Sequence, residues 1–230
     1  MDLDYLFHYF TQHVERVHAA HGYLSDVRRL ASELGIRMRP GLHNSLVWGD
    51  PPLITLSAED YGSRRQFSAM HEVAHLLLKE CGAESELLLY FGDLEEAAPA
   101  IEGWCNHAAG LLLLPRPLLQ AAEAEHGLSA ATVLSLQRSG QVSLGAALRR
   151  VVYAEPDRRL AAFASTAGRR VSDIAKLNFS VPFWRHDRLP ESIPRAAAQQ
   201  KTFALGEGSE VRGSCLRVPG RGALGLLVAP

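Results

Sequence analysis

The segment Phe67-Ser-Ala-Met-His-Glu-Val-Ala-His-Leu-Leu-Leu78 decides how the rest of the chain is interpreted. It contains an HExxH pentapeptide at residues 71–75, within a run whose apolar residues recur at helical spacing. Residues four apart lie on one face of a helix, so His71 and His75 can bind one cation. Glu72 lies beside that face, where its carboxylate can take a proton from water.

Zinc is the cation that these residue types suit. Neutral imidazole binds zinc well, and a catalytic zinc keeps three protein ligands and one open position. Zinc lowers the pKa of its water to about 7. The alternative is two ordinary histidines beside an ordinary glutamate, because the pentapeptide fixes three of five positions. The apolar stripe of the segment favours the metal site, since burying these polar groups without a metal would leave them in need of partners.

A third ligand can come from a second helical segment, Ile101-Glu-Gly-Trp-Cys-Asn106. A carboxylate is an ordinary third ligand beside a histidine pair, and Glu102 is the candidate. Asn106 is four residues further along and shares its face. Glu102 could equally be a first-turn acid that the helix dipole favours, and the residues alone leave both readings open.

The remaining pattern predicts an α+β fold with a mainly helical core. Helices are expected near residues 4–20, 25–34 (capped by Ser25), 63–79, 100–114 and 118–125, with an acidic loop from 84 to 99. Short extended segments at 36–38, 45–48 and 53–56 predict a small antiparallel sheet. Two short helices around Gly140 follow, and strands are expected after residue 151 at 159–164, 215–218 and 223–228.

Composition excludes several classes of protein. The chain has 230 residues, a net charge of −1 and 47% hydrophobic residues, which is ordinary globular composition. The longest apolar run, from Leu111 to Leu114, is far shorter than a membrane-spanning helix. Three scattered cysteines predict free thiols, and the acidic start lacks the basic residues of a secretory signal. We expect a cytoplasmic protein that binds no membrane, and the net charge does not predict polyanion binding.

The two quoted segments, the second extended through Ala108-Ala-Gly-Leu-Leu-Leu-Leu-Pro115, resemble the ImmA/IrrE family of metallopeptidases over residues 25–150. That family pairs an HExxH helix with a helix of the form Glu-x-x-Ala/Cys-Asn. The resemblance implies a zincin-like fold, zinc ligands His71, His75 and Glu102, and Glu72 as general base. It also implies that Asn106 occupies a common polar position near the metal, where it either orients a ligand or is a surface amide.

The resemblance divides the chain into a metallopeptidase domain (1–127), a helix-turn-helix-like segment (128–150) and a small β-rich region (151–230). The second short helix offers mainly Ser143, Arg149 and Arg150 to base edges, which argues against direct DNA binding. The aromatic stretch at 178–186 could line a cleft. There His186 is either a structural histidine or a group that stabilises an oxyanion.

The leading hypothesis is a zinc endopeptidase that cleaves a helix-turn-helix repressor and so derepresses stress-response or mobile-element genes. Mn²⁺ or Fe²⁺ also fits a ligand set of two nitrogens and one oxygen. The alternative is a non-catalytic, metal-stabilised module that sequesters a repressor or associates with DNA through residues 129–150.

Overall fold

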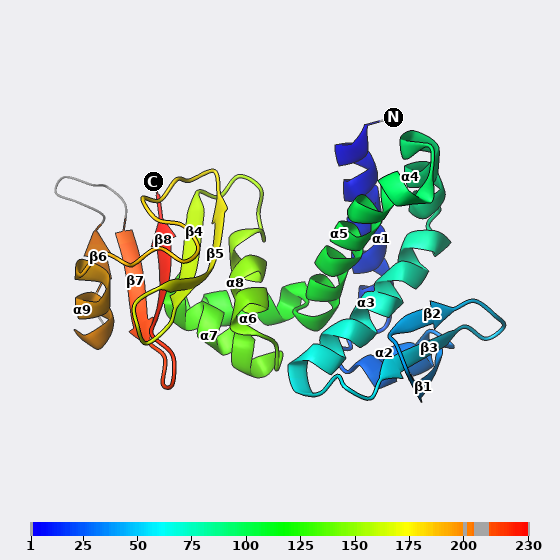
Figure 1. The fold of residues 1–230 in the computed structure, drawn as a ribbon, viewed down its shortest axis with the longest axis horizontal. Helices are drawn as coiled ribbons and strands as arrows, with labels where there is room; N and C mark the ends of the chain where they lie inside the picture. Colours follow the sequence, from blue (N-terminus) through cyan, green and yellow to red (C-terminus); the bar gives the residue numbers. More distant parts are fainter. Residues whose placement is uncertain (1, 200–201, 205–211, 230) are drawn as a thin grey trace. The chain divides into compact units, whose positions relative to one another are not determined.

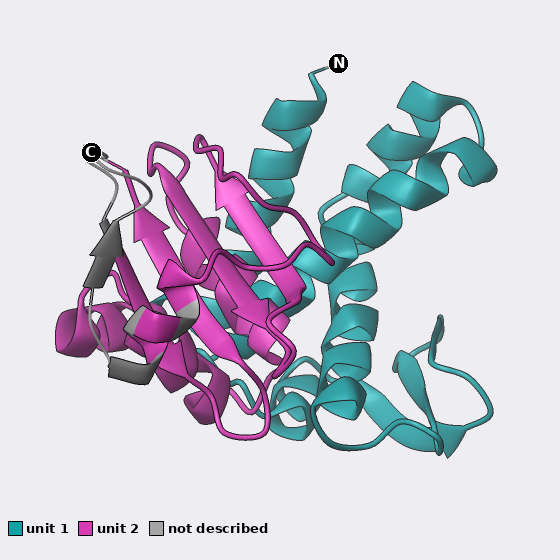
Figure 2. Ribbon diagram, turned by 60° about the vertical axis from the view of Figure 1, so that its left-hand side comes forward, with its two compact units in different colours: residues 1–116 teal, residues 117–230 magenta. Residues whose placement is uncertain are grey.

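The computed structural model describes residues 2–199, 202–204 and 212–229. The chain forms two compact units, Met1–Arg116 and Pro117–Pro230 (Figure 2). The α+β fold class predicted from the sequence is confirmed. Among the described residues, no helix is long and apolar enough to cross a membrane.

The first unit is mainly helical (Figure 1). Its elements are α1 (Leu3–Ala20), α2 (Val27–Glu33), β1 (Arg37–Gly41), β2 (Ser45–Val47), β3 (Leu53–Ser57), α3 (Gly62–Glu80), α4 (Ala83–Phe91) and α5 (Leu94–Leu113). The α1 helix packs on α5 through aromatic rings, with the Phe7 and Trp104 centroids 5.2 Å apart. Asp26, and not the predicted Ser25, caps α2, because its carboxylate accepts hydrogen bonds from the backbone N–H groups of Arg28 and Arg29.

The small sheet is mixed where the sequence suggested an antiparallel one. Its strand order is β1-β3-β2, with β2 antiparallel to β3 but β1 parallel to it. The central strand β3 is therefore the last of the three in sequence. The short extended segments identified the strands, but such a pattern carries no information on their spatial order.

The acidic stretch after residue 83 is helical, so the prediction of a loop there is wrong. Most of it forms α4 and the start of α5. Asp93 caps α5 by accepting from the backbone N–H of Glu96, and Glu95 and Glu96 lie in the first turn, where the helix dipole favours acids. Pro99 lies inside α5 and does not end the helix.

The second unit packs helices on an antiparallel sheet. Its elements are α6 (Arg116–His126, which begins at the boundary), α7 (Ala130–Ser139), α8 (Leu144–Val152), β4 (Leu160–Ser165), β5 (Val171–Leu177), α9 (Ser192–Gln199), β6 (Thr202–Ala204), β7 (Arg212–Arg217) and β8 (Ala223–Val228). The strand order is β5-β4-β8-β7-β6. Phe163 and Phe183 meet edge to face in its core with centroids 5.2 Å apart. The aromatic stretch expected to line a cleft therefore contributes Phe183 to the core.

The helix-turn-helix-like segment belongs to this second unit. The apolar face of α8 is buried, and α8 packs against β4 and β5. Arg149 on α8 donates to both carboxylate oxygens of Asp173 on β5, at 2.8 and 3.3 Å. The structure divides the chain after residue 116, whereas boundaries were expected after residues 127 and 150. The strands need α8 to cover their apolar side chains, so the helix-turn-helix-like segment and the β-rich region form one unit.

Gly145 allows this close packing, which leads to a prediction about stability. A Cβ at position 145 would overlap the Asp173 carboxylate. We expect Gly145→Ala to lower the melting temperature by about 3–9 °C, since overpacking costs roughly 1–3 kcal/mol. Gly110→Ala is the matched control, because a Cβ on Gly110 in α5 would meet nothing within 4 Å. Equal melting temperatures for the two variants, measured by circular dichroism, would contradict this account.

Candidate metal centre

The HExxH segment lies in the middle of α3, as predicted, and the helix is fixed by its apolar side. Its buried residues include Met70, Val73, Ala74, Leu77 and Leu78. The α3 helix makes its most extensive helix–helix contact with α5, which carries Glu102. The packing of these two helices determines where the three candidate ligands lie.

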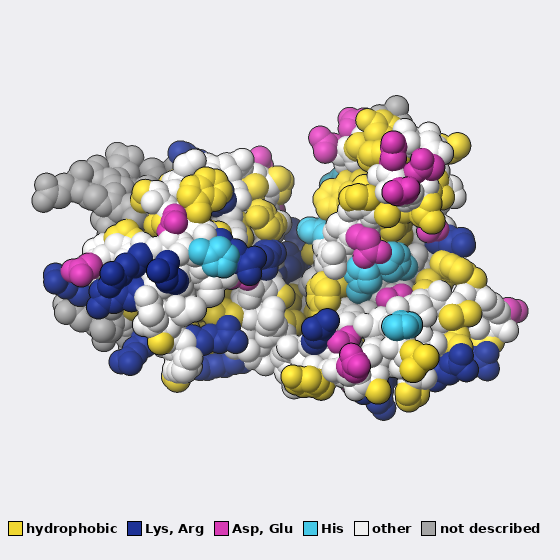
Figure 3. Space-filling view, in the orientation of Figure 1, with side chains coloured by type: hydrophobic (Ala, Val, Ile, Leu, Met, Phe, Trp, Pro, Cys, Tyr) yellow, Lys and Arg dark blue, Asp and Glu magenta, His cyan; other side chains and the backbone are white. Residues whose placement is uncertain are grey.

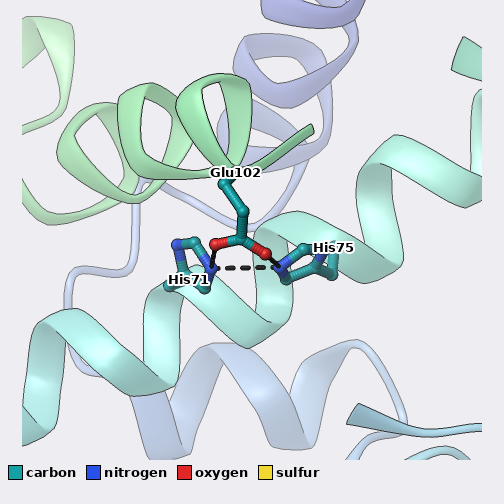
Figure 4. A group of neighbouring side chains, drawn as sticks. All are labelled: His71, His75 and Glu102. Carbon is teal, nitrogen blue, oxygen red and sulfur yellow. Dashed lines mark hydrogen bonds and ion pairs between the residues drawn. The ribbon is translucent and has the colours of Figure 1, made fainter. Parts of the chain in front are cut away.

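His71, His75 and Glu102 converge on one point (Figure 4). The two Nε2 atoms lie 3.0 Å apart. The Glu102 carboxylate approaches both rings, with Oε2 3.1 Å from His71 Nε2 and Oε1 3.5 Å from His75 Nε2. The histidine side chains are 14% and 20% exposed, and the Glu102 side chain is 56% exposed. The site is therefore partly buried with access to solvent.

The donor set fits a tetrahedral divalent ion. Bonds of about 2.0–2.1 Å in a tetrahedral site separate the ligand atoms by roughly 3.3 Å. The observed separations, 3.0 Å between the two Nε2 atoms and 3.1 and 3.5 Å from Nε2 to carboxylate oxygen, bracket this value. Burial lowers the pKa of His75, and the neighbouring His71 lowers it further, against the opposite effect of Glu102. His75 is thus favoured in the neutral form that binds metal.

Glu72 occupies a different environment from Glu102. It is 8% exposed, and this burial raises its pKa to about 7, with a further contribution from the charge of Glu102. A backbone hydrogen bond from Leu46 on β2 acts in the opposite direction. Leu46 was not among the predicted site residues, because contact between a strand and the helix follows from tertiary packing and no local pattern signals it.

The other candidate residues lie outside the three-residue cluster. Asn106 is exposed on α5, one turn after Glu102, and its role stays a prediction. His186 is exposed and belongs to the second unit, so its suggested contribution to an oxyanion site also stays a prediction. Cys105 is a buried free thiol whose pKa is raised by burial, as expected for a small apolar residue.

Comparison with known proteins assigns the family. The model of the IrrE N-terminal-like domain, the M78 peptidase family, matches residues 21–152, which is more than half of the chain. The chain belongs to this family. The M78 match includes all of the HExxH helix and all of α5. It also confirms the resemblance to ImmA/IrrE proteins.

A solved structure shares the fold of this M78 family member. A Mycobacterium tuberculosis transcriptional regulator is similar with a TM-score of 0.59 and 16% sequence identity, over 96% of this chain and 76% of the regulator. At this identity the likeness concerns the fold. No curated protein matches the sequence.

A polar cluster anchors the start of the HExxH helix. The buried Asp60 carboxylate accepts from Ser68 Oγ at 2.6 Å and Asn44 Nδ2 at 2.8 Å, and it pairs with Arg64 at 2.9 Å. Asn44 precedes β2, and its Oδ1 accepts from the backbone N–H of Ser57 at 2.8 Å. The cluster therefore connects α3 to both strands beside the site.

Asp60 predicts a pH dependence of stability. The hydrogen bonds from Ser68 and Asn44, together with Arg64, lower its pKa below the ordinary value of 3.8. Its contribution is therefore fully present above the unfolded pKa and is lost as the pH falls through the lower folded pKa. We expect Asp60→Asn to lower the melting temperature by about 3–6 °C at pH 7. The difference from the unmodified protein should shrink below about pH 4, and an unchanged difference in thermal melts would contradict the assignment.

Replacing either candidate histidine ligand should abolish stabilisation by zinc, and replacing Glu102 should reduce it. A ligand at 100 times its Kd stabilises the folded state by about 2.7 kcal/mol, which corresponds to roughly 5–10 °C in melting temperature. We expect this rise for the unmodified protein and no rise for His71→Ala or His75→Ala. Glu102→Gln should weaken zinc binding at least 10-fold in titration calorimetry. His8→Ala, an exposed histidine on α1, is the control that should bind zinc normally.

Proposed function

We propose that this protein is a zinc-dependent endopeptidase, with Mn²⁺ or Fe²⁺ as possible replacements for zinc. The observation that carries this proposal is the convergence of His71, His75 and Glu102 beside a buried Glu72. Membership of the M78 family supports peptide-bond hydrolysis as the reaction class. A peptidase needs a third ligand and a general base in addition to a histidine pair, and Glu102 and Glu72 would supply them.

His71, His75 and Glu102 would hold the ion at a partly exposed position, which leaves room for a substrate. When bound, the metal polarises the scissile carbonyl and makes water a stronger nucleophile. Glu72 would accept the proton of the attacking water and donate it to the leaving amine. Burial raises the pKa of Glu72 to about 7, which makes it a better proton acceptor, and the charge of a bound ion would favour its deprotonated form at neutral pH.

The edge of the small sheet offers a place for the substrate backbone. Within the described residues, β2 pairs only with β3, so its second edge can accept an extended peptide by strand addition. The Leu46 backbone group that contacts Glu72 belongs to this edge strand. A peptide added here would lie beside the general base.

The proposed substrate is a helix-turn-helix repressor, cleaved in the cytoplasm to derepress stress-response or mobile-element genes. One structural neighbour is a Mycobacterium tuberculosis transcriptional regulator, which supports a regulatory setting. The alternative of DNA association through residues 129–150 is disfavoured because α8 uses Leu144, Leu148 and Val151 to pack in the second unit. Its Arg149 is paired with Asp173.

Glu72→Gln separates catalysis from metal binding. The amide keeps the shape of the side chain but cannot accept the proton, so we expect cleavage of a co-expressed repressor to fall by about 10²–10⁴-fold. Fragment masses measure cleavage, and elemental analysis should show that the bound metal is unchanged. Glu80→Gln, an exposed glutamate at the end of the same helix, is the matched control.

Two outcomes would refute the proposed role. Undiminished cleavage by Glu72→Gln would remove Glu72 as the base. A repressor that binds the unmodified, metal-loaded protein but never changes mass would instead identify a non-catalytic module that sequesters its partner.

A further inference from the structure

The two compact units carry opposite charges. Residues 1–116 contain 9 Lys and Arg and 16 Asp and Glu, a net charge of −7. Residues 117–230 contain 15 basic and 9 acidic residues, a net charge of +6. The net charge of −1 for the whole chain hides this separation. The positive second unit can therefore attract a polyanion although the whole chain is nearly neutral.

Part of this positive charge forms a surface that we call the arginine surface. It consists of the exposed residues Arg169, Arg170, Arg185, Arg188 and Arg195. They come from the β4–β5 turn, the segment between β5 and α9, and α9 itself. Figure 3 shows Lys and Arg side chains gathered in a band across the second unit, with few acidic groups among them.

Backbone hydrogen bonds hold the segments that carry these arginines side by side. The Leu189 N–H donates to the Arg169 carbonyl at 2.9 Å, and the His186 N–H donates to the Val171 carbonyl at 2.8 Å. Arg170 and Arg188 are antiparallel partners in an isolated bridge. Side chains directly opposite each other in such a pair lie close together, and like charges there repel. An anion between the two guanidinium groups would relieve this repulsion.

Nearby acids compensate only part of the charge. Glu191 is shared between two arginines, with its oxygens 3.6 Å from Arg169 and 3.9 Å from Arg195. The Asp187 carboxylate accepts from the backbone N–H of Trp184 at 2.8 Å. Arg170 donates to the His186 backbone carbonyl, and Arg185 donates to the Ser172 backbone carbonyl. These hydrogen bonds orient the two guanidinium groups but do not neutralise their charge. The surface is thus ordered and still cationic.

An exposed indole lies in the same segment. Trp184 is 59% exposed, and Lys176 Nζ lies 3.1 Å from its ring centroid. Guanidinium groups match phosphate oxygens in a bidentate geometry, and exposed aromatic rings stack on unpaired bases. An acidic protein would use the arginines but has no particular need of the indole. Together the two features favour a single-stranded nucleic acid.

We propose that the arginine surface and Trp184 bind single-stranded nucleic acid, with the arginines on the phosphates and the indole against a base. This function is additional to peptide hydrolysis and is independent of the metal site. It uses residues outside the helix-turn-helix-like segment. DNA and RNA share the phosphodiester backbone that the arginines would contact, so both belong in the test.

The experiment measures fluorescence anisotropy of labelled 20-nucleotide DNA and RNA strands with the 230-residue chain between 50 and 300 mM NaCl. If three to five phosphates are contacted, log K against log salt should have a slope of about −2 to −3.5. Arg170→Glu with Arg188→Glu should weaken binding at least 10-fold and flatten the slope. Trp184→Ala should weaken it several-fold and leave the slope unchanged, since stacking releases no counterions.

The matched control is Arg28→Glu with Arg29→Glu, which changes the net charge equally but on exposed residues of the acidic unit. It should bind within twofold of the unmodified protein. If circular dichroism shows that the first double variant is unfolded, Arg185→Gln with Arg195→Gln replaces it, with weaker binding again expected.

Three results would overturn the proposal. The first is absence of binding at 50 mM NaCl, and the second is an equal loss in both charge-reversal variants. The third is competition by polyglutamate, or by a DNA duplex, as strong as that of an unlabelled single strand. Polyglutamate competition would assign the surface to an acidic protein.

Discussion

The packing of α3 against α5 is the constraint on which the proposed chemistry depends. Each helix buries an apolar stripe in the first unit, and this packing fixes where the polar residues at its margin lie. A shift by one helical turn is about 5.4 Å, more than the separations of 3.0 to 3.5 Å among the ligand atoms. The apolar contacts between the helices therefore place the three candidate ligands.

Local pattern predicted most of the helices and part of the site, but it missed α4 and α9. The four-residue spacing predicted that His71 and His75 share a face, and they do. The spacing did not decide whether Glu102 is a metal ligand or a first-turn acid. Its contact with α3 joins residues about 30 positions apart in the sequence, and local spacing says nothing about such contacts. The family resemblance, rather than the spacing, supplied that assignment. The Leu46 contact to Glu72 had no sequence signal, since it requires knowledge of which strand forms the sheet edge.

The structure differs from the sequence-based predictions where a residue type is common in two kinds of structure. Acids near residue 95 are typical of loops, yet at the start of α5 they favour the helix through its dipole. Phenylalanines at 179 and 183 could have lined a cleft, but they pack with the core beneath β4 and β8. Gly225 makes room there, because a Cβ at that position would overlap the Phe163 ring. Composition identifies such residues, whereas only packing decides their use.

Environment separates the roles of the two glutamates of the site. Glu102 is half-exposed and directs one oxygen at each histidine, an arrangement suited to a ligand. Glu72 is almost fully buried, and burial raises its pKa to about 7, which suits proton transfer. A general base at the half-exposed position of Glu102 would lack the burial that raises the pKa of Glu72. The two glutamates thus differ in chemistry because the fold buries Glu72 and leaves Glu102 half-exposed.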